Sequence, residues 1–299
     1  MNSISYIIPH YNSVESLKRL LDSITLIDQD EIIVIDDCSS NTSLIELQKL
    51  QKNKRFRLLS TGKNGGAGKA RNIGMDKASN KWLIFADSDD YFVPDYRDLL
   101  KKYTNKEEID IVYFTPTSIS ESKNSSVRTT RHEYYEYLVS EYLKGSKDGL
   151  NSLKYKFVVP WSKLINRDYV STHGFKFDEV YVSNDVMFSA KTASETHRIL
   201  ATKDVIYCCV ESDNSLTSDI SVKQTLDRLD IFIEYYKYIE LQMEKNEFYN
   251  LNIVGLSYLV LAIRNSFSIS DLMIIYKKLK RNNIRILTVK YLKETISRF

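Results

Sequence analysis

Three aspartates stand close together in the stretch FADSDDYF, residues 85–92. Asp87, Asp89 and Asp90 follow directly after the apolar run WLIFA, and carboxylates at this spacing disfavour one another's ionisation unless a positive charge lies among them. Turns favour Asp because its side chain bonds to nearby backbone, so a solvated turn is one interpretation. The other is a divalent cation, because Mg²⁺ and Mn²⁺ prefer carboxylate oxygens as ligands.

The glycine-rich run GGAGKARN, residues 65–72, is a second candidate for ligand binding. Its small residues let a backbone approach a ligand, and Lys69 and Arg71 stand where a helix is expected to begin. A helix N-terminus with adjacent cations suits a phosphate group. The run has neither the Walker spacing nor the position of a dinucleotide fingerprint after the first strand. A turn and helix start without a ligand is an equally good interpretation.

The elements that must position these residues alternate along the first 115 residues. Apolar runs predict strands at 4–8, 31–35, 56–60, 81–86 and 109–114, with amphipathic helices between them. This alternation predicts an α/β fold with a mostly parallel sheet flanked by helices. Ligands of such sheets bind beyond the carboxyl ends of the strands. The clusters PHYN, DDCSS and ADSDD each follow a strand, so we expect them to meet at one edge.

Composition fits an ordinary globular protein of 299 residues, with one large or two modest domains. Cys38, Cys208 and Cys209 have neither a disulfide nor a zinc spacing, which favours reduced cysteines in a cytoplasmic protein. The first residues do not resemble a signal peptide, and the longest apolar stretch, 251–263, is too short to span a bilayer. We therefore expect a cytoplasmic protein that at most lies on a membrane.

Four stretches in order, SYIIPHYNSVESLKRLLDSI, EIIVIDDCSSNTS, NGGAGKARNIGM and WLIFADSDDYFVPD, resemble the successive motifs of the family 2 glycosyltransferases. The resemblance is close over residues 3–100 and looser to about 217. It implies the Rossmann-like GT-A fold and metal-dependent, inverting transfer from a nucleotide sugar, with Mn²⁺ or Mg²⁺ as cofactor. It divides the chain into a GT-A domain at 1–217, with a nucleotide-sugar-binding half at 1–115 and an acceptor-binding half at 116–217, and a helical C-terminal region at 218–299.

The resemblance also assigns roles on the donor side. Tyr11 contacts the base, and Asp37 accepts a hydrogen bond from the uracil ring N–H. Asp87 holds the ribose or a metal-bound water, and Asp89 ligates the metal, so that both count as metal residues. The implied nucleotide-sugar-binding residues are Pro9, His10, Tyr11, Asn12, Asp36, Asp37, Gly66, Lys69, Arg71, Asp87 and Ser88.

The acceptor site is expected in the middle of the chain. Trp161 is either a core residue or a platform on which a sugar stacks, and Lys163 follows it in the same family segment. Where the family usually shows a Glu-Asp pair, this chain has Asn184 and Asp185. The resemblance implies that Asp185 is the catalytic base and that Asn184 lies at the acceptor. Ser183 or Asn184 is also expected to cap the following helix, and Asp178 and Glu179 are the alternative bases.

The implied reaction transfers a hexose or N-acetylhexosamine from a UDP-sugar to a hydroxyl of a glycan or lipid-linked glycan, in the synthesis of a surface polysaccharide. Two alternatives stay open: a non-catalytic nucleotide-sugar-binding protein, because the Glu is replaced, and a donor other than a uridine nucleotide. Residues 271–299 carry a net charge of +6, which is either a solvated helical face or a peripheral membrane contact. No aromatic-basic binding motif accompanies this charge, so nucleic acid is not an expected partner.

Overall fold

The computed structural model describes residues 3–106, 108–122, 125–211 and 220–288. The chain divides into two compact units, Met1–Ser212 and Asp213–Phe299. The domain boundary that the sequence predicts after residue 217 lies outside the described residues. Each unit is described by itself below.

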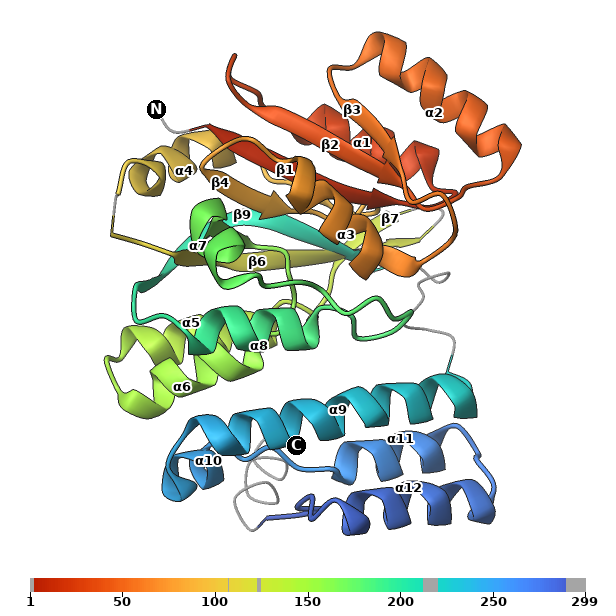
Figure 1. The fold of residues 1–299 in the computed structure, drawn as a ribbon, viewed down its shortest axis with the longest axis vertical. Coiled ribbons are helices and arrows are strands. Elements are labelled where there is room, and N and C mark those ends of the chain that lie inside the picture. Colours follow the sequence, from red (N-terminus) through yellow and green to blue (C-terminus); the bar gives the residue numbers. More distant parts are fainter. Residues whose placement is uncertain (1–2, 107, 123–124, 212–219, 289–299) are drawn as a thin grey trace. The chain divides into compact units, whose positions relative to one another are not determined.

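In its described residues the first unit is built on one nine-stranded sheet with the order β3-β2-β1-β4-β8-β6-β9-β5, and β7 pairs with β6 (Figure 1). Strands β1 to β4 are parallel, as the alternation of strands and helices predicts. Beyond them the sheet is mixed, because β8 lies antiparallel between β4 and β6, and β9 pairs parallel with β6. The strands are β1 (Ile4–His10), β2 (Glu31–Asp36), β3 (Arg57–Ser60), β4 (Trp82–Phe85), β5 (Tyr91–Phe92), β6 (Ile111–Ser122), β7 (Ser125–Arg128), β8 (Lys163–Asn166) and β9 (Ile199–Glu211).

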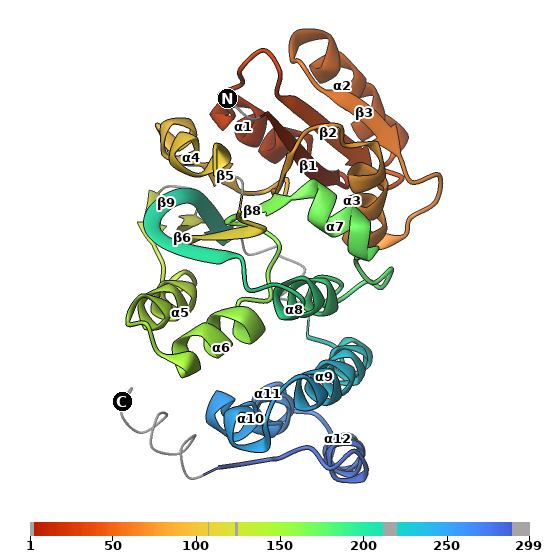
Figure 2. The same ribbon diagram turned by 60° about the vertical axis from the view of Figure 1, so that its left-hand side comes forward.

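Helices cover both faces of this sheet, as Figure 2 shows. Side chains alternate between the two faces along a strand, so Tyr6 and Ile8 pack into one core and Ile7 into the other. The first core includes residues of α1 and α4, and the second includes residues of α3, α5, α6, α7 and α8. The helices are α1 (Val14–Ser23), α2 (Asn41–Asn53), α3 (Gly66–Lys77), α4 (Tyr96–Thr104), α5 (Glu133–Leu143), α6 (Lys147–Lys156), α7 (Arg167–His173) and α8 (Val186–Ser194).

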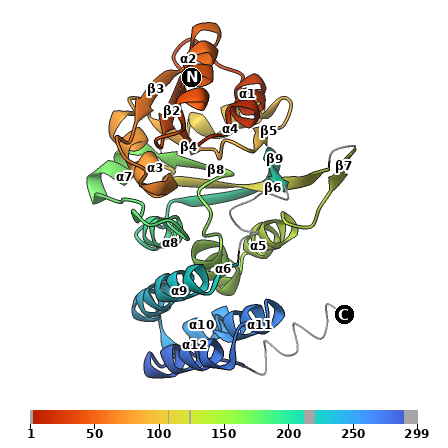
Figure 3. The ribbon, with the colours of Figure 1, turned by 90° about the vertical axis from the view of Figure 1, so that its right-hand side faces the viewer.

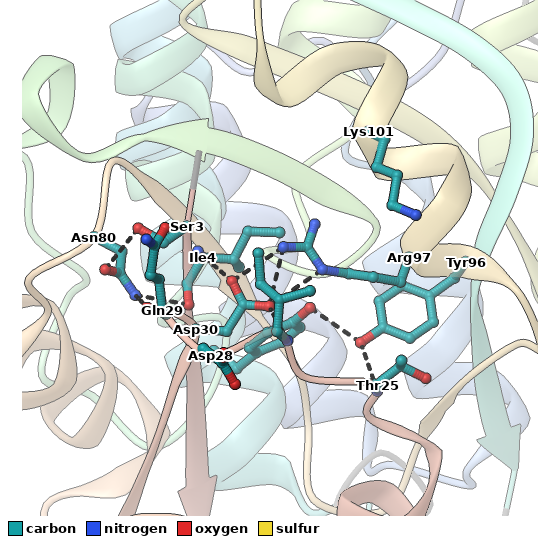
Figure 4. Close-up of polar contacts among 12 residues, drawn as sticks. Ser3, Ile4, Thr25, Asp28, Gln29, Asp30, Asn80, Tyr96, Arg97 and Lys101 are labelled. Atoms are coloured by element: carbon teal, nitrogen blue, oxygen red, sulfur yellow. Dashed lines mark hydrogen bonds and ion pairs between the residues drawn. The ribbon is translucent and has the colours of Figure 1, made fainter. Parts of the chain in front are cut away.

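A buried ion pair closes the edge of the sheet where the parallel strands begin (Figure 4). The Asp30 carboxylate accepts hydrogen bonds from Arg97 Nε at 3.1 Å and Arg97 Nη2 at 3.0 Å. It also accepts from the backbone N–H of Ile4 at 2.9 Å and of Ile27 at 3.1 Å. This cluster therefore ties α4 to β1 and to the loop before β2.

The second unit is helical, as the sequence predicts for this region. It contains α9 (Val222–Gln242), α10 (Lys245–Leu251), α11 (Leu256–Arg264) and α12 (Ile269–Arg281), which Figure 1 shows separately. Its core includes Leu229, Ile233, Tyr236, Phe248, Ala262, Ile275 and Leu279. In the part of the chain that the structure describes, no helix combines the length and the hydropathy that a membrane span needs.

Candidate active site

The loops that follow β1 and β2 are held together by a buried histidine. His10 Nδ1 lies 3.1 Å from Asp36 Oδ1, and His10 Nε2 accepts from the backbone N–H of Ser13 at 3.3 Å. Nδ1 is thus the protonated nitrogen of a neutral ring, and burial lowers the pKa of His10, which favours this form. His10 is 1 % exposed and Pro9 is also buried. His10 therefore supports the two loops from inside the fold, and the contact of Pro9 and His10 with the nucleoside, which the resemblance implies, stays a prediction.

Tyr11 and Asn12 follow His10 in the loop between β1 and α1. Asn12 adopts a left-handed backbone conformation, and its Oδ1 accepts from the backbone N–H of Ser40 at 2.8 Å. The backbone N–H of Asn12 donates to Ser39 Oγ at 2.9 Å. Tyr11 is 53 % exposed, so its ring is available to a flat ligand beyond the carboxyl ends of the strands.

Asp37 anchors the glycine-rich loop at the start of α3. Its carboxylate accepts from the backbone N–H of Gly65 at 2.9 Å, from that of Gly66 at 2.7 Å and from Thr61 Oγ1 at 2.7 Å. Gly66 has φ +81°, a conformation that favours glycine. Because a carboxylate accepts about four hydrogen bonds, one acceptor position of Asp37 stays unused by these contacts. Lys69 Nζ donates to the Thr61 carbonyl at 2.9 Å within the same loop.

The run GGAGKARN has a second role, which the sequence does not reveal. One side of α3 is the surface on which the segment before α8 packs. A Cβ at Gly68 would lie 2.1 Å from the carbonyl oxygen of Asp178, so only glycine fits there. Asn72 Oδ1 accepts from the backbone N–H of Phe177 at 2.8 Å, and Asn72 Nδ2 donates to the Phe177 carbonyl at 2.9 Å. The run therefore fixes residues 177–184 as well as the loop held by Asp37.

Arg71 joins this segment to the acidic loop after β4. Its Nη1 donates to Asn184 Oδ1 at 2.8 Å, and its Nη2 donates to Asp87 Oδ1 at 2.5 Å. The guanidinium carbon lies 5.3 Å from the ring centroid of Phe177, and Arg71 is 4 % exposed. Arg71 and Asn184 thus occupy each other. The roles that the resemblance implies, contact with the donor for Arg71 and with the acceptor for Asn184, stay predictions.

Asp185 lies next to this bridge, directly before α8, and is half-buried. Burial raises the pKa of Asp185, and the positive charge of Arg71 opposes this rise. A carboxylate with a raised pKa is suited to accept a proton near neutral pH. The helix cap predicted from Ser183 or Asn184 is wrong, because no side chain caps α8 and Asn184 bonds to Arg71 instead.

Trp161 and Lys163 are core residues. Trp161 is 2 % exposed and stacks on Tyr207 with the ring centroids 5.8 Å apart. Lys163 is also 2 % exposed, and its Nζ donates to the Phe157 carbonyl at 2.7 Å. Burial lowers the pKa of Lys163 to about 7, against the opposing effect of the Asp185 charge. Both side chains therefore pack in the core, which is one of the two interpretations of Trp161, and their contact with the acceptor stays a prediction.

The acidic loop after β4 contains three differently placed carboxylates. Asp90 is buried and accepts from Tyr207 Oη at 2.8 Å and from the backbone N–H of Val210 at 2.7 Å, so it anchors β9. Burial raises the pKa of Asp90, and the charges of Asp89 and Asp87 raise it further. The Asp87 side chain is 31 % exposed and Asp89 is exposed. These two are accessible to a ligand.

Ser88, between them, connects the loop to the start of α1, because Ser88 Oγ lies 3.0 Å from Ser13 Oγ. Among the described residues, no group of three or more His, Cys, Asp and Glu side chains is arranged to hold a metal ion. Mg²⁺ in enzymes that handle phosphates is typically bound by one or two carboxylates, with the substrate phosphates and water completing its shell. The pair Asp87 and Asp89 fits that donor set.

A mixed α/β sheet with acidic loops beyond its parallel strands is the architecture of the GT-A glycosyltransferases. The sequence profile of the family named Glycosyl transferase family 2 matches residues 5–174. This chain belongs to glycosyl transferase family 2, as its four motifs predict.

Two curated relatives align with different parts of the chain. The poly(ribitol-phosphate) beta-N-acetylglucosaminyltransferase TarS of Staphylococcus aureus is 34 % identical over 96 residues, 30 % of this chain and 17 % of TarS. The uncharacterized glycosyltransferase EpsJ of Bacillus subtilis is 26 % identical over 232 residues, 75 % of this chain and 65 % of EpsJ. The chain therefore spans less than two thirds of either relative.

Solved structures show the same fold. Residues 1–349 of S. aureus TarS in complex with UDP-GlcNAc match with a TM-score of 0.63 and 19 % identity, over 90 % of this chain and 74 % of that one. The mannosyltransferase PcManGT of Pyrobaculum calidifontis in complex with GDP-Man and Mn²⁺ matches with a TM-score of 0.58 and 14 % identity, over 98 % and 83 %.

Proposed function

We propose that this chain transfers a hexose or N-acetylhexosamine from a UDP-sugar to a hydroxyl group of a glycan or lipid-linked glycan, with inversion at the anomeric carbon. The observation that carries the proposal is the connection of three carboxylates at one edge of the sheet. Asp37 holds the glycine-rich loop, and Arg71 of the following helix bonds to Asp87 and to the residue before Asp185. The residues proposed for the donor, the metal and the base are thereby all joined to the glycine-rich loop and α3.

The nucleoside is assigned to the space beside Tyr11 and Asp37. The exposed ring of Tyr11 offers a stacking surface, and the unused acceptor position of Asp37 suits the N–H of a uracil ring. The UDP-GlcNAc in the complex of TarS supports a uridine donor. The GDP-Man in the complex of PcManGT keeps a guanosine donor as the competing assignment.

The metal is assigned to Asp87 and Asp89. Mg²⁺ or Mn²⁺ at this position would neutralise negative charge on the diphosphate of the donor. The Mn²⁺ in the complex of PcManGT supports this assignment. Arg71 keeps one carboxylate oxygen of Asp87 fixed, so the loop after β4 presents its remaining oxygens in a defined direction.

Asp185 is assigned as the general base. The acceptor oxygen attacks the anomeric carbon on the side opposite the diphosphate, and its proton moves to a carboxylate oxygen of Asp185. The bond between the anomeric carbon and the diphosphate oxygen breaks, and its electron pair leaves with the nucleoside diphosphate. This single displacement inverts the anomeric configuration and needs no covalent intermediate with the protein.

The product is assigned to the cell-surface polysaccharides. TarS, by its name, adds N-acetylglucosamine to a poly(ribitol-phosphate), a polymer whose ribitol units carry repeating hydroxyl groups. An acceptor of this class, growing on a lipid carrier, would bring the enzyme to the inner face of the membrane.

The proposal is tested by the release of nucleoside diphosphate from a panel of UDP-, GDP- and dTDP-sugars, with Mn²⁺ or Mg²⁺ and with EDTA. We expect release from a UDP-sugar that depends on the metal, even in the absence of an acceptor. Asp89→Asn should abolish it. The control Asp95→Asn changes an exposed aspartate in a left-handed conformation that Asn tolerates, and should leave release unchanged. No release from any donor, together with no metal-dependent nucleotide binding, would refute the proposal.

A further inference from the structure

The outer face of α12 is apolar although it faces solvent. Ile269, Met273 and Tyr276 are 81 %, 47 % and 41 % exposed. They stand at positions i, i+4 and i+7 and therefore share one side of the helix. Ile275 and Leu279 point to a different side of the helix and are fully buried in the core of the unit. Figure 3 shows α12 along the outer edge of the helical unit, with its helical neighbours on one side only.

Basic side chains border this apolar stripe. Lys277, Lys280 and Arg281 are exposed on the same helix, and together with the three apolar residues they form what we name the α12 outer face. Between residues 256 and 288 the sequence has six Lys or Arg and a single acidic residue, Asp271. The Asp271 carboxylate accepts from Ser268 Oγ at 2.6 Å in a capping box at the start of α12 and keeps its negative charge, which leaves this stretch with a net charge of +5.

The charge of α9, the longest helix of the same unit, has the opposite sign. Its exposed side chains include four acidic residues and two lysines, a net charge of −2. Lys278, which faces α9, is paired with Asp230 at 2.5 Å and is not part of the α12 outer face. The exposed residues on α9 are Lys223, Asp227, Asp230, Glu234, Lys237 and Glu240. Positive charge and exposed apolar side chains are therefore concentrated together on α12.

We propose that the α12 outer face docks on an anionic lipid surface. Helices that lie in the interface of a bilayer place apolar side chains among the headgroups, and flanking Lys and Arg residues are attracted to anionic lipid. The apolar contact with the headgroup region is made by Ile269, Met273 and Tyr276. The attraction to anionic lipid comes from Lys277, Lys280 and Arg281. A second copy of the chain is a poorer occupant, because a two-fold contact would bring Lys277 and Lys280 against a face with the same charge.

The test is co-sedimentation of the full chain with vesicles, measured without any donor or acceptor. We expect binding to vesicles of phosphatidylcholine with phosphatidylglycerol, weaker binding at about 1 M salt than at about 0.1 M, and none to phosphatidylcholine alone. Lys277→Glu with Lys280→Glu should weaken binding at least about 30-fold, since each basic residue near such a surface contributes about 5-fold. Ile269→Ser with Met273→Ser should weaken it about 10-fold or more without unfolding the chain, because both side chains are exposed.

The matched control is Lys49→Glu with Lys52→Glu, two exposed lysines on α2 whose substitution changes the net charge by the same amount. Equal binding to neutral vesicles, absence of binding, or an equal loss in the control would overturn the proposal. It is also overturned if the chain forms dimers in sedimentation equilibrium that Lys277→Glu with Lys280→Glu dissociates. Because vesicle binding is measured without substrate, its outcome is independent of nucleoside diphosphate release, and either proposal can fail alone.

Discussion

Two clusters of charged side chains lie at opposite edges of the same sheet, and they are built differently. At the edge where the parallel strands begin, Asp30 is 2 % exposed and its carboxylate accepts four hydrogen bonds, two of them from Arg97. At the edge where they end, Arg71 divides its hydrogen bonds between Asp87 and Asn184. The carboxylates of Asp87 and Asp185 are there only partly buried.

This difference indicates that the Asp30 cluster stabilises the fold, whereas the other edge can bind a ligand. The chain itself satisfies Asp30, so that cluster leaves no acceptor position for a ligand and contributes to the fold. The other edge keeps carboxylates that are close to one another and accessible to solvent, an arrangement that becomes favourable when a cation or a proton arrives. The same change, Asp to Asn, should therefore have opposite consequences at the two edges.

The largest effect is expected for Asp185→Asn. Loss of the general base should lower the rate of sugar transfer by about 10²- to 10⁴-fold, while the affinity for UDP with Mn²⁺ stays within a small factor. Steady-state transfer and calorimetric titration with UDP measure the two quantities. Asp178→Asn and Glu179→Gln are the matched controls, because each converts a carboxylate to an amide in the same segment. A larger loss in either control than in Asp185→Asn would move the role of base to that residue.

The next largest effect is expected for the buried ion pair of Asp30 and Arg97. Asp30→Asn leaves Arg97 as a buried charge without its carboxylate, which should lower the free energy of unfolding by about 3–5 kcal/mol. Urea unfolding measures this loss, and the folded fraction should keep its specific activity. Asp22→Asn is the control, because Asp22 pairs with Lys54 at the surface and the pair is worth less than about 1 kcal/mol. If both variants lost the same free energy of unfolding, burial would not determine how much the Asp30 ion pair contributes to stability.

Asn184→Ala, at the edge where the parallel strands end, should have a smaller effect. The substitution removes a neutral acceptor from Arg71, and a hydrogen bond to a charged group contributes about 1.5–3 kcal/mol. We expect the rate of transfer to fall about 10-fold, with little change in UDP affinity, because Arg71 keeps its bond to Asp87. Asn53→Ala, an exposed amide at the end of α2, serves as the control. A loss of UDP affinity equal to the loss of rate would show that the bridge supports the donor loop instead of the segment before Asp185.

The sequence predicted the parts of the fold that depend on local pattern. The alternation of apolar runs and amphipathic helices identified β1 to β4, and the polar residues that follow them do lie at one edge of the sheet. The run GGAGKARN was predicted to let a backbone approach a ligand, which stays a prediction, whereas the contact of Gly68 with the Asp178 carbonyl was not foreseen.

The rest could not be predicted because it depends on pairing between distant residues. Arg71 and Asn184 are 113 positions apart, and Asp90 and Tyr207 are 117 apart, so no local pattern relates them. Trp161 is buried by residues distant in sequence, among them Tyr207, so the sequence left open whether it packs in the core or stacks on a sugar. The antiparallel position of β8 between β4 and β6 was not predicted either. An antiparallel strand inserted into a parallel sheet leaves no signature in the alternation of strands and helices.

The smallest predicted effect tests whether the charge of Asp185 lowers the stability of the fold, whereas that of Asp30 raises it. Because burial raises the pKa of Asp185 in the folded chain above its ordinary value of 3.8, the folded state binds this proton more tightly than the unfolded state. The charged carboxylate therefore costs stability when the pH is above its folded-state pKa, and the cost disappears below 3.8, where both states are protonated. Asp185→Asn should raise the midpoint of thermal unfolding at neutral pH, and the gain should shrink as the pH falls to about 4.

Asp76→Asn is the control for this measurement, since Asp76 is exposed and pairs with Lys176 at the surface. Its midpoint should follow that of the unchanged chain at every pH within a small margin. A lower midpoint for Asp185→Asn at neutral pH would mean that the charged carboxylate stabilises the fold, as Asp30 does. The two edges of the sheet would then not differ in the way proposed, and the pairing of Arg71 with its neighbours would have to be counted as part of the structural core rather than as support for a ligand.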